Sequence, residues 1–195
     1  MPTATCSSAI AIDATARVRR ATPDDVPALA RIYAHEVAHG TASCEYTPPD
    51  AREFARRFTA IRDGGYPYLV ADVDGRVGGF AYGSAYRTRE GYRWVVEDSV
   101  YVDAAFRGRG LGGRLLDALI GRCTALGYRR MIAVIGDGGN AASIALHERA
   151  GFSVAARFAG LGFKHGRWLE NVQMVRALGA GDTSPPAAAP LPDAD

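Results

Sequence analysis

The sequence has little of what disulfide-bonded or zinc-bound frameworks are built from. Its 195 residues include three cysteines, Cys6, Cys44 and Cys123, which lie far apart and without C-x-x-C spacing. An odd number of cysteines in such positions indicates neither a disulfide framework nor a zinc site. We therefore expect no metal ligand set and a protein of the reducing cytoplasm.

Long apolar runs and a strong charge excess are also missing. Residues 1–16 have no basic leader, and Asp13 interrupts their one short apolar stretch, so we expect neither a signal peptide nor a membrane anchor. The formal net charge is +2 at pH 7. This modest and scattered excess suits a small anionic cofactor but is too weak to indicate nucleic acid as a partner.

What is present is the composition of one ordinary globular domain. Hydrophobic residues make up 48% of the chain, and a chain of this length buries roughly 70% of the surface that its unfolded form exposes. We expect a domain at residues 17–178 with a disordered N-terminal tail at 1–16. Residues 179–195 are rich in Pro and Ala and have no periodic apolar face, so we expect a disordered C-terminal tail there.

Hydrophobic periodicity predicts seven strands and four helices in the order β-α-α-β-β-β-α-β-α-β-β. The clearest signals are the tight-turn pair Asp74-Gly75 between two strands, a strand at 93–102, a helix from Gly110 to Gly127 and a buried strand at 131–136. Hairpins are combined with one strand-helix-strand crossover. The predicted fold class is therefore α/β (α+β), with a mixed sheet of about seven strands and helices on both faces.

The stretch "RGRGLGG" at residues 107–113 satisfies G-x-G-x-x-G. In a dinucleotide fold the first glycine turns the chain directly at the strand end, and an acid about 20 positions later binds the ribose. Here five residues separate Val102 from Gly108, and the next acid at a strand end, Asp137, lies 29 positions after Gly108. The pattern therefore favours a pyrophosphate seat made of bare amides, a helix start and arginines. A glycine-rich helix start with solvated arginines is the alternative interpretation.

A carboxylate interrupts the predicted apolar strand "WVVEDSVYV". Period-two alternation puts Glu97 on the face of Ser99 and Tyr101, whereas Asp98 shares the other face with Val100. Partial burial raises the pKa of a carboxyl group, which would suit Glu97 to remove a proton from a substrate ammonium. The alternative is an acid at a strand edge, or one paired for structural reasons.

Polar residues on the later elements allow similar pairs of interpretations. His147 could act as an acid or assist a base, or it could be a histidine of the core or the helix surface. Asn140 is first of all a helix N-cap. Lys164 and His165 are expected in a solvated turn.

The segment "YRTREGYRW" before the carboxylate strand is rich in arginine and aromatic residues. Arg87, Arg89 and Arg93 could bind a carboxylate or phosphinate, and Tyr92 and Trp94 could form a wall beside it. A solvated basic loop is the alternative.

The segments "VYVDAAFRGRGLGGRLLDALI" and "NAASIALHERAGF" together resemble the GNAT superfamily of acyl-CoA N-acetyltransferases, whose signature is R/Q-x-x-G-x-G/A. More narrowly, "YPYLVADVDGRVGGFAYG", "YRTREGYRWVVEDSVYV" and "GFKHGRWLENVQM" look like parts of phosphinothricin and methionine-sulfone N-acetyltransferases. The resemblance covers residues 17–176. It implies a GNAT fold in which acetyl-CoA lies between splayed parallel strands, here 95–102 and 131–136.

The resemblance also assigns cofactor contacts by position in this chain. The pantetheine arm would pair with the backbone of Val100, Tyr101 and Val102 and would touch Asn140 and Ser143. The pyrophosphate would bind the six signature positions, namely Arg107, Gly108, Arg109, Gly110, Leu111 and Gly112. The third glycine of the G-x-G-x-x-G match, Gly113, is then incidental.

The activity implied is direct acetyl transfer from acetyl-CoA to the amino group of a small amino-acid-like substrate, associated with herbicide or antibiotic resistance. Glu97 would be the base, His147 would protonate the departing thiolate, and an N–H near Val100 or Val102 would stabilise the oxyanion. The family also implies a homodimer. Two positions depart from its pattern, because many relatives have His or Ser at Asp98 and an aromatic residue at Cys44.

Two other functions fit the same features. A peptide or protein N-terminal acetyltransferase would need an open and often acidic groove, whereas the arginines at 87–93 favour a small acidic amino acid. A non-catalytic module that binds acetyl-CoA as a signal would not need the carboxylate and imidazole of Glu97 and His147.

Overall fold

A seven-stranded mixed sheet organises the chain in the computed structural model, which describes residues 16–194. The strands are β1 (Arg17–Arg20), β2 (Tyr68–Val73), β3 (Arg76–Ala85), β4 (Val95–Val102), β5 (Arg130–Ile135), β6 (Ser153–Lys164) and β7 (Arg167–Ala177). The helices are α1 (Val26–His39), α2 (Ala51–Asp63), α3 (Leu111–Ala125) and α4 (Ala141–Arg149). The predicted fold class and element order are confirmed. The N-terminal tail expected at 1–16 lies outside the described residues, apart from the buried Ala16.

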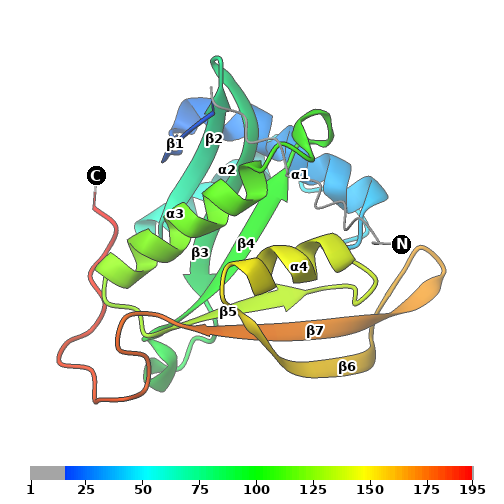
Figure 1. Ribbon diagram of the computed structural model, residues 1–195. Coiled ribbons are helices and arrows are strands. Elements are labelled where there is room, and N and C mark those ends of the chain that lie inside the picture. Colours follow the sequence, from blue (N-terminus) through cyan, green and yellow to red (C-terminus); the bar gives the residue numbers. More distant parts are fainter. Residues whose placement is uncertain (1–15, 195) are drawn as a thin grey trace, which may run out of the picture.

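The strands are arranged in the order β1-β2-β3-β4-β5-β7-β6 (Figure 1). Among these strands β4 and β5 form the parallel pair, and the other neighbours run antiparallel. A parallel pair needs a crossover connection, and α3 supplies it. The turn between β2 and β3 is the expected tight hairpin, in which Asp74 and Gly75 have φ of 51° and 78°. Two successive positive φ values are typical of a type I′ turn.

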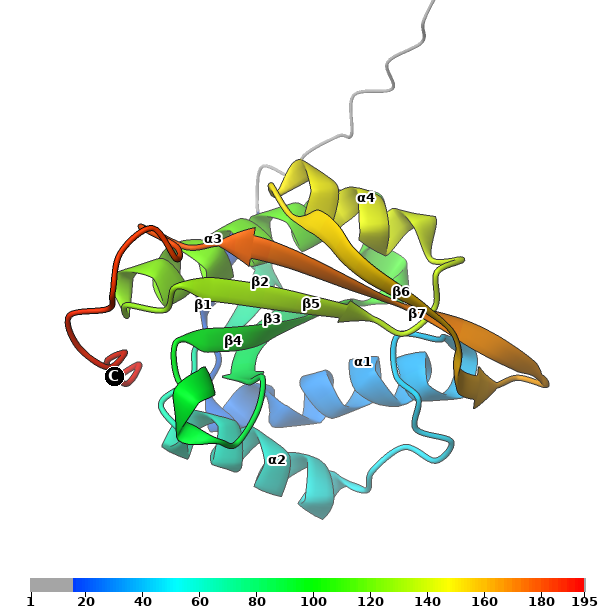
Figure 2. The same ribbon diagram turned by 90° about the horizontal axis from the view of Figure 1, so that it is seen from below.

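Helices cover both faces of the sheet, as Figure 2 shows with α1 and α2 on one side and α3 and α4 on the other. On the α3 side the fully buried leucines Leu111, Leu115, Leu116 and Leu119 repeat at helical spacing and pack on the sheet. On the α1 and α2 side the core is largely aromatic, with Phe54 and Phe58 against strand residues. In the described part of the chain no helix has the length and apolarity to cross a bilayer.

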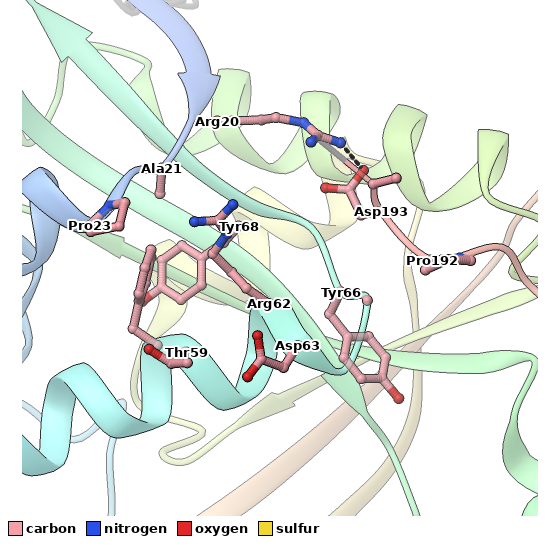
Figure 3. Close-up of a pocket in the computed structure, with 13 residues that line it drawn as sticks. Arg20, Ala21, Pro23, Thr59, Arg62, Asp63, Tyr66, Tyr68, Pro192 and Asp193 are labelled. Atoms are coloured by element: carbon pink, nitrogen blue, oxygen red, sulfur yellow. Dashed lines mark hydrogen bonds and ion pairs between the residues drawn. The ribbon is translucent and has the colours of Figure 1, made fainter.

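The C-terminal segment, residues 179–194, differs from the expected disordered tail because it lies against the domain (Figure 1). Its backbone bonds to two turns, with Leu191 N donating to Leu126 O at 2.8 Å and Asp193 N donating to Gly65 O at 2.8 Å. The Asp193 carboxylate is 5% exposed and binds Arg20 at 2.5 Å and also Arg122 (Figure 3). Ion pairs and backbone hydrogen bonds hold this segment, and neither kind of contact produces an apolar period in the sequence.

Residues at the start of β5 also hold the C-terminal segment. Arg129 Nε donates to Gly181 O at 2.7 Å and its Nη2 donates to Ser184 O at 2.8 Å. Arg130, the first residue of β5, pairs with Asp182. The segment therefore closes the end of the β4–β5 pair at which the two strands start.

We predict that Asp193→Asn lowers the free energy of unfolding by about 1 kcal/mol, because it removes a carboxylate shared by two half-exposed arginines. Urea denaturation followed by circular dichroism measures the change. The matched control is Asp182→Asn, which alters a side chain that is 74% exposed and is expected to leave the stability nearly unchanged. Equal effects of the two substitutions would contradict an anchoring role of Asp193.

Candidate functional site

The site forms where β4 and β5 separate. Their parallel pairing runs from Val95 opposite Arg130 to Asp98 opposite Ala133. Beyond that point β4 continues beside β3 as far as Val102, and β5 continues beside β7 as far as Ile135. Each strand therefore keeps its outer neighbour while the inner edges diverge, as Figure 1 shows between α3 and α4. The splayed pair predicted from the sequence is present.

A cavity of about 420 Å³ lies in this opening. It is bounded by the end of β4, the loop after α1 and the start of α4. The structure brings together here six residues predicted to contact the cofactor, namely Val100, Tyr101, Val102, Arg107, Asn140 and Ser143. Asn140 is also the expected N-cap, because its Oδ1 accepts a hydrogen bond from Ser143 N at 3.1 Å.

The glycine-rich loop after β4 leads directly into α3. Gly108 and Gly110 both have φ of 75°, a left-handed conformation that is strained for any residue with a side chain. Gly110 is the N-cap of the 15-residue helix α3. Bare amide groups at a helix N-terminus favour an anion. Arg107 pairs with Glu36 at 3.1 Å, and the Arg109 guanidinium lies 5.1 Å from the centre of the Phe106 ring.

The two glycines that follow Leu111 have room for a side chain. A Cβ at Gly112 would meet Leu146 of α4 and Val102 of β4 at ordinary van der Waals distances. Gly113 has no residue near the position that a Cβ would occupy. Sterics therefore do not require a glycine at 113, in agreement with its expected incidental place in the motif.

A second cavity, of about 340 Å³, adjoins the first and is lined by Glu97. The expected alternation along β4 is confirmed, because Tyr101 packs on the α1 side whereas Val100 and Val102 pack on the α3 side. Burial raises the pKa of Glu97, and the charge of Asp98 raises it further, while Arg87 opposes the shift. A half-buried carboxyl with a raised pKa is a chemically suitable proton acceptor.

His147 from α4 lines the same cavity and is 4% exposed. Its Nε2 lies 3.0 Å from Asp98 Oδ2, and its Nδ1 lies 2.8 Å from the Ser143 carbonyl oxygen. Burial by itself lowers the pKa of His147, but the hydrogen bond and charge of Asp98 outweigh that effect and raise it. His147 is thus a buried residue of the cavity wall whose two ring nitrogens both make hydrogen bonds, and it does not lie on the helix surface.

Four further residues shape this cavity without having been assigned a site role from the sequence. Lys164 was expected in a solvated turn, but it is 2% exposed and its Nζ donates to Ser43 O at 2.7 Å. This bond fixes the loop that brings Ser43 and Cys44 to the cavity. Asn171 of β7 also lines the cavity, and its Oδ1 is buried without a hydrogen-bond partner among the described residues. A single polar residue in a strand gives no periodic signal that would have found these contacts.

The predicted substrate-binding segment lies beside the two cavities and not in their walls. Arg87 stacks over Tyr86 with its guanidinium 5.1 Å from the ring centre, and its charge reaches Glu97. Exposed side chains make up most of the remainder, including Arg89 and Tyr92.

The last two residues of that segment have structural partners. Arg93 pairs with Glu90 and lies over the Trp94 ring. The Trp94 Nε1–H donates to Ala188 O at 2.9 Å, so the indole faces the C-terminal segment. Trp94 lines neither cavity, and its role as a wall of the substrate site stays a prediction. The docked C-terminal segment, which the sequence did not predict, gives the indole this partner.

Metal chemistry has no visible ligand set in the described part of the chain. Residues 16–194 contain no group of three or more His, Cys, Asp or Glu side chains arranged to hold a metal ion. The side chains of Glu97, Asp98 and His147 all line the second cavity.

Comparison with known sequences gives a consistent result. The sequence model of the acetyltransferase (GNAT) family matches residues 31–152. Phosphinothricin N-acetyltransferase of Alcaligenes faecalis is 48% identical over 169 residues, which cover 87% of this chain and 86% of that protein. L-methionine sulfoximine/L-methionine sulfone acetyltransferase of Pseudomonas paraeruginosa is 44% identical over 157 residues, which cover 80% of this chain and 91% of that protein.

Comparison with solved structures agrees. The crystal structure of a GNAT superfamily phosphinothricin acetyltransferase from Sinorhizobium meliloti, in complex with acetyl-CoA, matches with a TM-score of 0.88 and 48% sequence identity. The match covers 92% of this chain and 97% of that one. Together with the splayed strands, the glycine-rich helix start and the sequence matches, this establishes that the chain belongs to the acetyltransferase (GNAT) family.

Proposed function

We propose that this protein transfers the acetyl group of acetyl-CoA to the amino group of a small amino-acid-like substrate of the phosphinothricin, methionine sulfone or methionine sulfoximine type. The observation that carries the proposal is the half-buried Glu97 in a cavity that adjoins the opening between β4 and β5. A proton acceptor is thereby next to the predicted acetyl-CoA cleft. The named relatives, matched over most of their length, support the same substrate class.

Acetyl-CoA would bind along the inner edge of β4 and across the start of α3. The pyrophosphate would be held by the amides and positive end of α3 with Arg107 and Arg109, which agrees with the left-handed glycines that keep this turn bare. The pantetheine arm would lie along Val100 to Val102, opposite Asn140 and Ser143. These backbone groups of β4 face an opening and not a paired strand.

The chemistry follows from the residues of the second cavity. Glu97 removes a proton from the substrate ammonium, directly or through water, and the free amine attacks the thioester carbonyl. A backbone N–H of Val100 or Val102 donates to the oxyanion. We propose direct transfer from acetyl-CoA to the amine, and the buried Cys123 is an unsuitable nucleophile because burial raises the pKa of its thiol to about 12.

Substrate selection would depend on the rim of this cavity. Arg87 and Arg89 are exposed cations on the segment before β4, the charge of Arg87 reaches Glu97, and both suit the carboxylate or phosphinate of an amino acid. Cys44, from the loop held by Lys164, lines the cavity in place of a larger aromatic side chain. A smaller side chain there leaves more room for the substrate, and differences of this kind change specificity by about 1–3 kcal/mol.

We further propose a homodimer, built on the outer face of β6 and β7, and a cytoplasmic location. The edge strand β6 has several large exposed apolar side chains, and the adjoining β7 adds another. They are Val154, Phe158, Leu161, Phe163 and Trp168, with exposed fractions between 41% and 68%. A monomer seldom exposes several large apolar side chains on an open sheet edge, and we call these five side chains the apolar strip.

The first prediction concerns Glu97. Glu97→Gln is expected to lower kcat/KM for phosphinothricin or methionine sulfone about 100-fold or more, because the amide cannot accept the proton. The wild-type kcat/KM should rise with pH as Glu97 deprotonates, with a midpoint above the ordinary range of a glutamate because burial raises its pKa. Acetyl-CoA consumption measures both effects.

Glu148→Gln is the matched control, since Glu148 is exposed on α4 next to His147. It should retain wild-type turnover. Polyamines and peptides complete the substrate panel. Turnover of peptides but not amino acids would replace the proposed substrate class, and acetyl-CoA binding without turnover of any amine would indicate a binding module.

The glycine turn gives a second prediction. Gly110→Ala places a Cβ at φ 75°, which costs about 1–2 kcal/mol and should distort the anion seat. We expect acetyl-CoA binding, measured by calorimetry, to weaken about tenfold. Gly113→Ala is the control, because its Cβ meets open space and should leave the Kd unchanged. Equal losses in both variants would argue against a seat made by the turn.

The dimer gives a third prediction. Leu161→Asp, which puts a charge on the apolar strip of β6, should convert the dimer to a monomer in light scattering coupled to size exclusion. Leu191→Asp is the control, because Leu191 is 65% exposed on the C-terminal segment and lies outside that strip. A wild-type protein that is monomeric at all accessible concentrations would overturn the proposal.

A further inference from the structure

The pair formed by Asp98 and His147 lies at the point where the two parallel strands separate. Asp98 is opposite Ala133 in the last parallel pair, and its side chain is 2% exposed. One carboxylate oxygen, Oδ2, lies 3.0 Å from His147 Nε2. The other, Oδ1, is buried without a hydrogen-bond partner among the described residues. The imidazole is therefore the group that compensates this buried carboxylate.

The partners of the ring identify the hydrogens that it carries. A carbonyl oxygen can only accept, so the contact with Ser143 O places a hydrogen on Nδ1. An ionised Asp98 can also only accept, which places a second hydrogen on Nε2. With both hydrogens present, His147 is an imidazolium, and its raised pKa agrees with that state. The ring is held at right angles to the Phe152 ring, with 5.1 Å between the centroids.

The two nitrogens are not equivalent as proton donors. Nε2–H is bound to a charged carboxylate, which makes the stronger hydrogen bond, whereas Nδ1–H is bound to a neutral carbonyl. Transfer of the Nδ1 proton breaks the hydrogen bond to Ser143 O and leaves a neutral ring that still donates to Asp98. This is the relation between aspartate and histidine in catalytic triads, in which the acid fixes the tautomer and the opposite nitrogen exchanges the proton.

We propose that Asp98 is a positioning residue that keeps a hydrogen on His147 Nε2 and stabilises the imidazolium. His147 then acts as the acid of the reaction while Glu97 acts as the base. This inference rests on the proposed acetyl transfer. Glu97 and His147 line the same cavity but have opposite roles, because Glu97 accepts a proton and His147 donates one.

The proton balance is complete without a further reactant. The C–S bond of the tetrahedral intermediate breaks, its electron pair goes to sulfur, and the Nδ1 proton of His147 converts the thiolate to the thiol. The substrate ammonium loses two protons on becoming an amide. One goes to Glu97 and leaves to solvent, and the other restores the imidazolium.

Other titratable groups near the pair come from several elements. Glu97 and Asp98 are on β4, Tyr82 is on β3, and Cys44 is on the loop after α1, and all four line the cavity with His147. Cys123 on α3 senses Asp98, because burial raises the pKa of its thiol and the Asp98 charge adds to that shift. Among these groups Asp98 has the direct bond to the ring, so its removal should change His147 most.

The test is Asp98→Asn, which keeps the shape of the side chain and removes its charge. An acid must be protonated to act, so the wild-type kcat/KM should fall at high pH as the His147 imidazolium loses its proton. This fall is the alkaline limb of the pH profile. In the variant this limb should move to lower pH by about one unit or more, with kcat at pH 8 falling at least about tenfold. The acetyl-CoA Kd should stay unchanged. Glu148→Gln again serves as the control.

A direct measurement covers the case in which Asp98→Asn fails to fold. Nitrogen-15 spectra of the wild type labelled at histidine should show His147 as an imidazolium at pH 7 and as the Nε2–H tautomer when it deprotonates. A Nδ1–H tautomer, or an alkaline limb unchanged in the variant, would overturn the inference. A wild type that turns over no amine would instead refute the proposed function, while the spectra would still report the state of the pair.

Discussion

The separation of β4 from β5 is the constraint on which the rest of the site depends. Four residues of parallel pairing hold the strands together, and β3 and β7 then keep them on diverging paths. Backbone N–H and C=O groups need partners when they are buried. On the inner edge of β4 beyond Asp98 these backbone groups can bind a ligand, and the cavity between the strands gives that ligand access.

The same separation brings the two faces of the sheet into one site. Glu97 and Asp98 are adjacent along β4 and point to opposite faces, where a continuous sheet would keep them apart. Because the sheet opens directly beyond them, both line the same cavity. Asp98 reaches His147 on α4, and Glu97 lies toward Tyr82 and Ser99 on the α1 side. One strand thus supplies the proposed proton acceptor, Glu97, and the partner of the proposed proton donor, His147.

The closed end of the strand pair is braced from outside the sheet. Trp94 directly precedes β4, Arg130 is the first residue of β5, and both contact the C-terminal segment. Asp193 connects that segment to β1 and α3 through two arginines. A V-shaped opening requires one rigid end, and these contacts add to the backbone ladder there. They also explain why Trp94 is turned away from the cavities.

The sequence by itself determined the element order, the mixed sheet, the crossover helix and the glycine-rich start of that helix. Each depends on local signals, namely the apolar period, the Asp74-Gly75 turn and the caps at Asn140 and Gly110, which act over a few residues. The alternation of Glu97 and Asp98 is equally local. Only the tertiary structure decided that His147 pairs with Asp98, 49 positions away, and that Lys164 is buried against Ser43.

It also decided that residues 179–194 dock on the domain and that Trp94 faces them. These contacts are polar and join distant segments. A single hydrogen bond or ion pair leaves no periodic trace in the chain, so its partner becomes visible only when the fold has brought the two groups together.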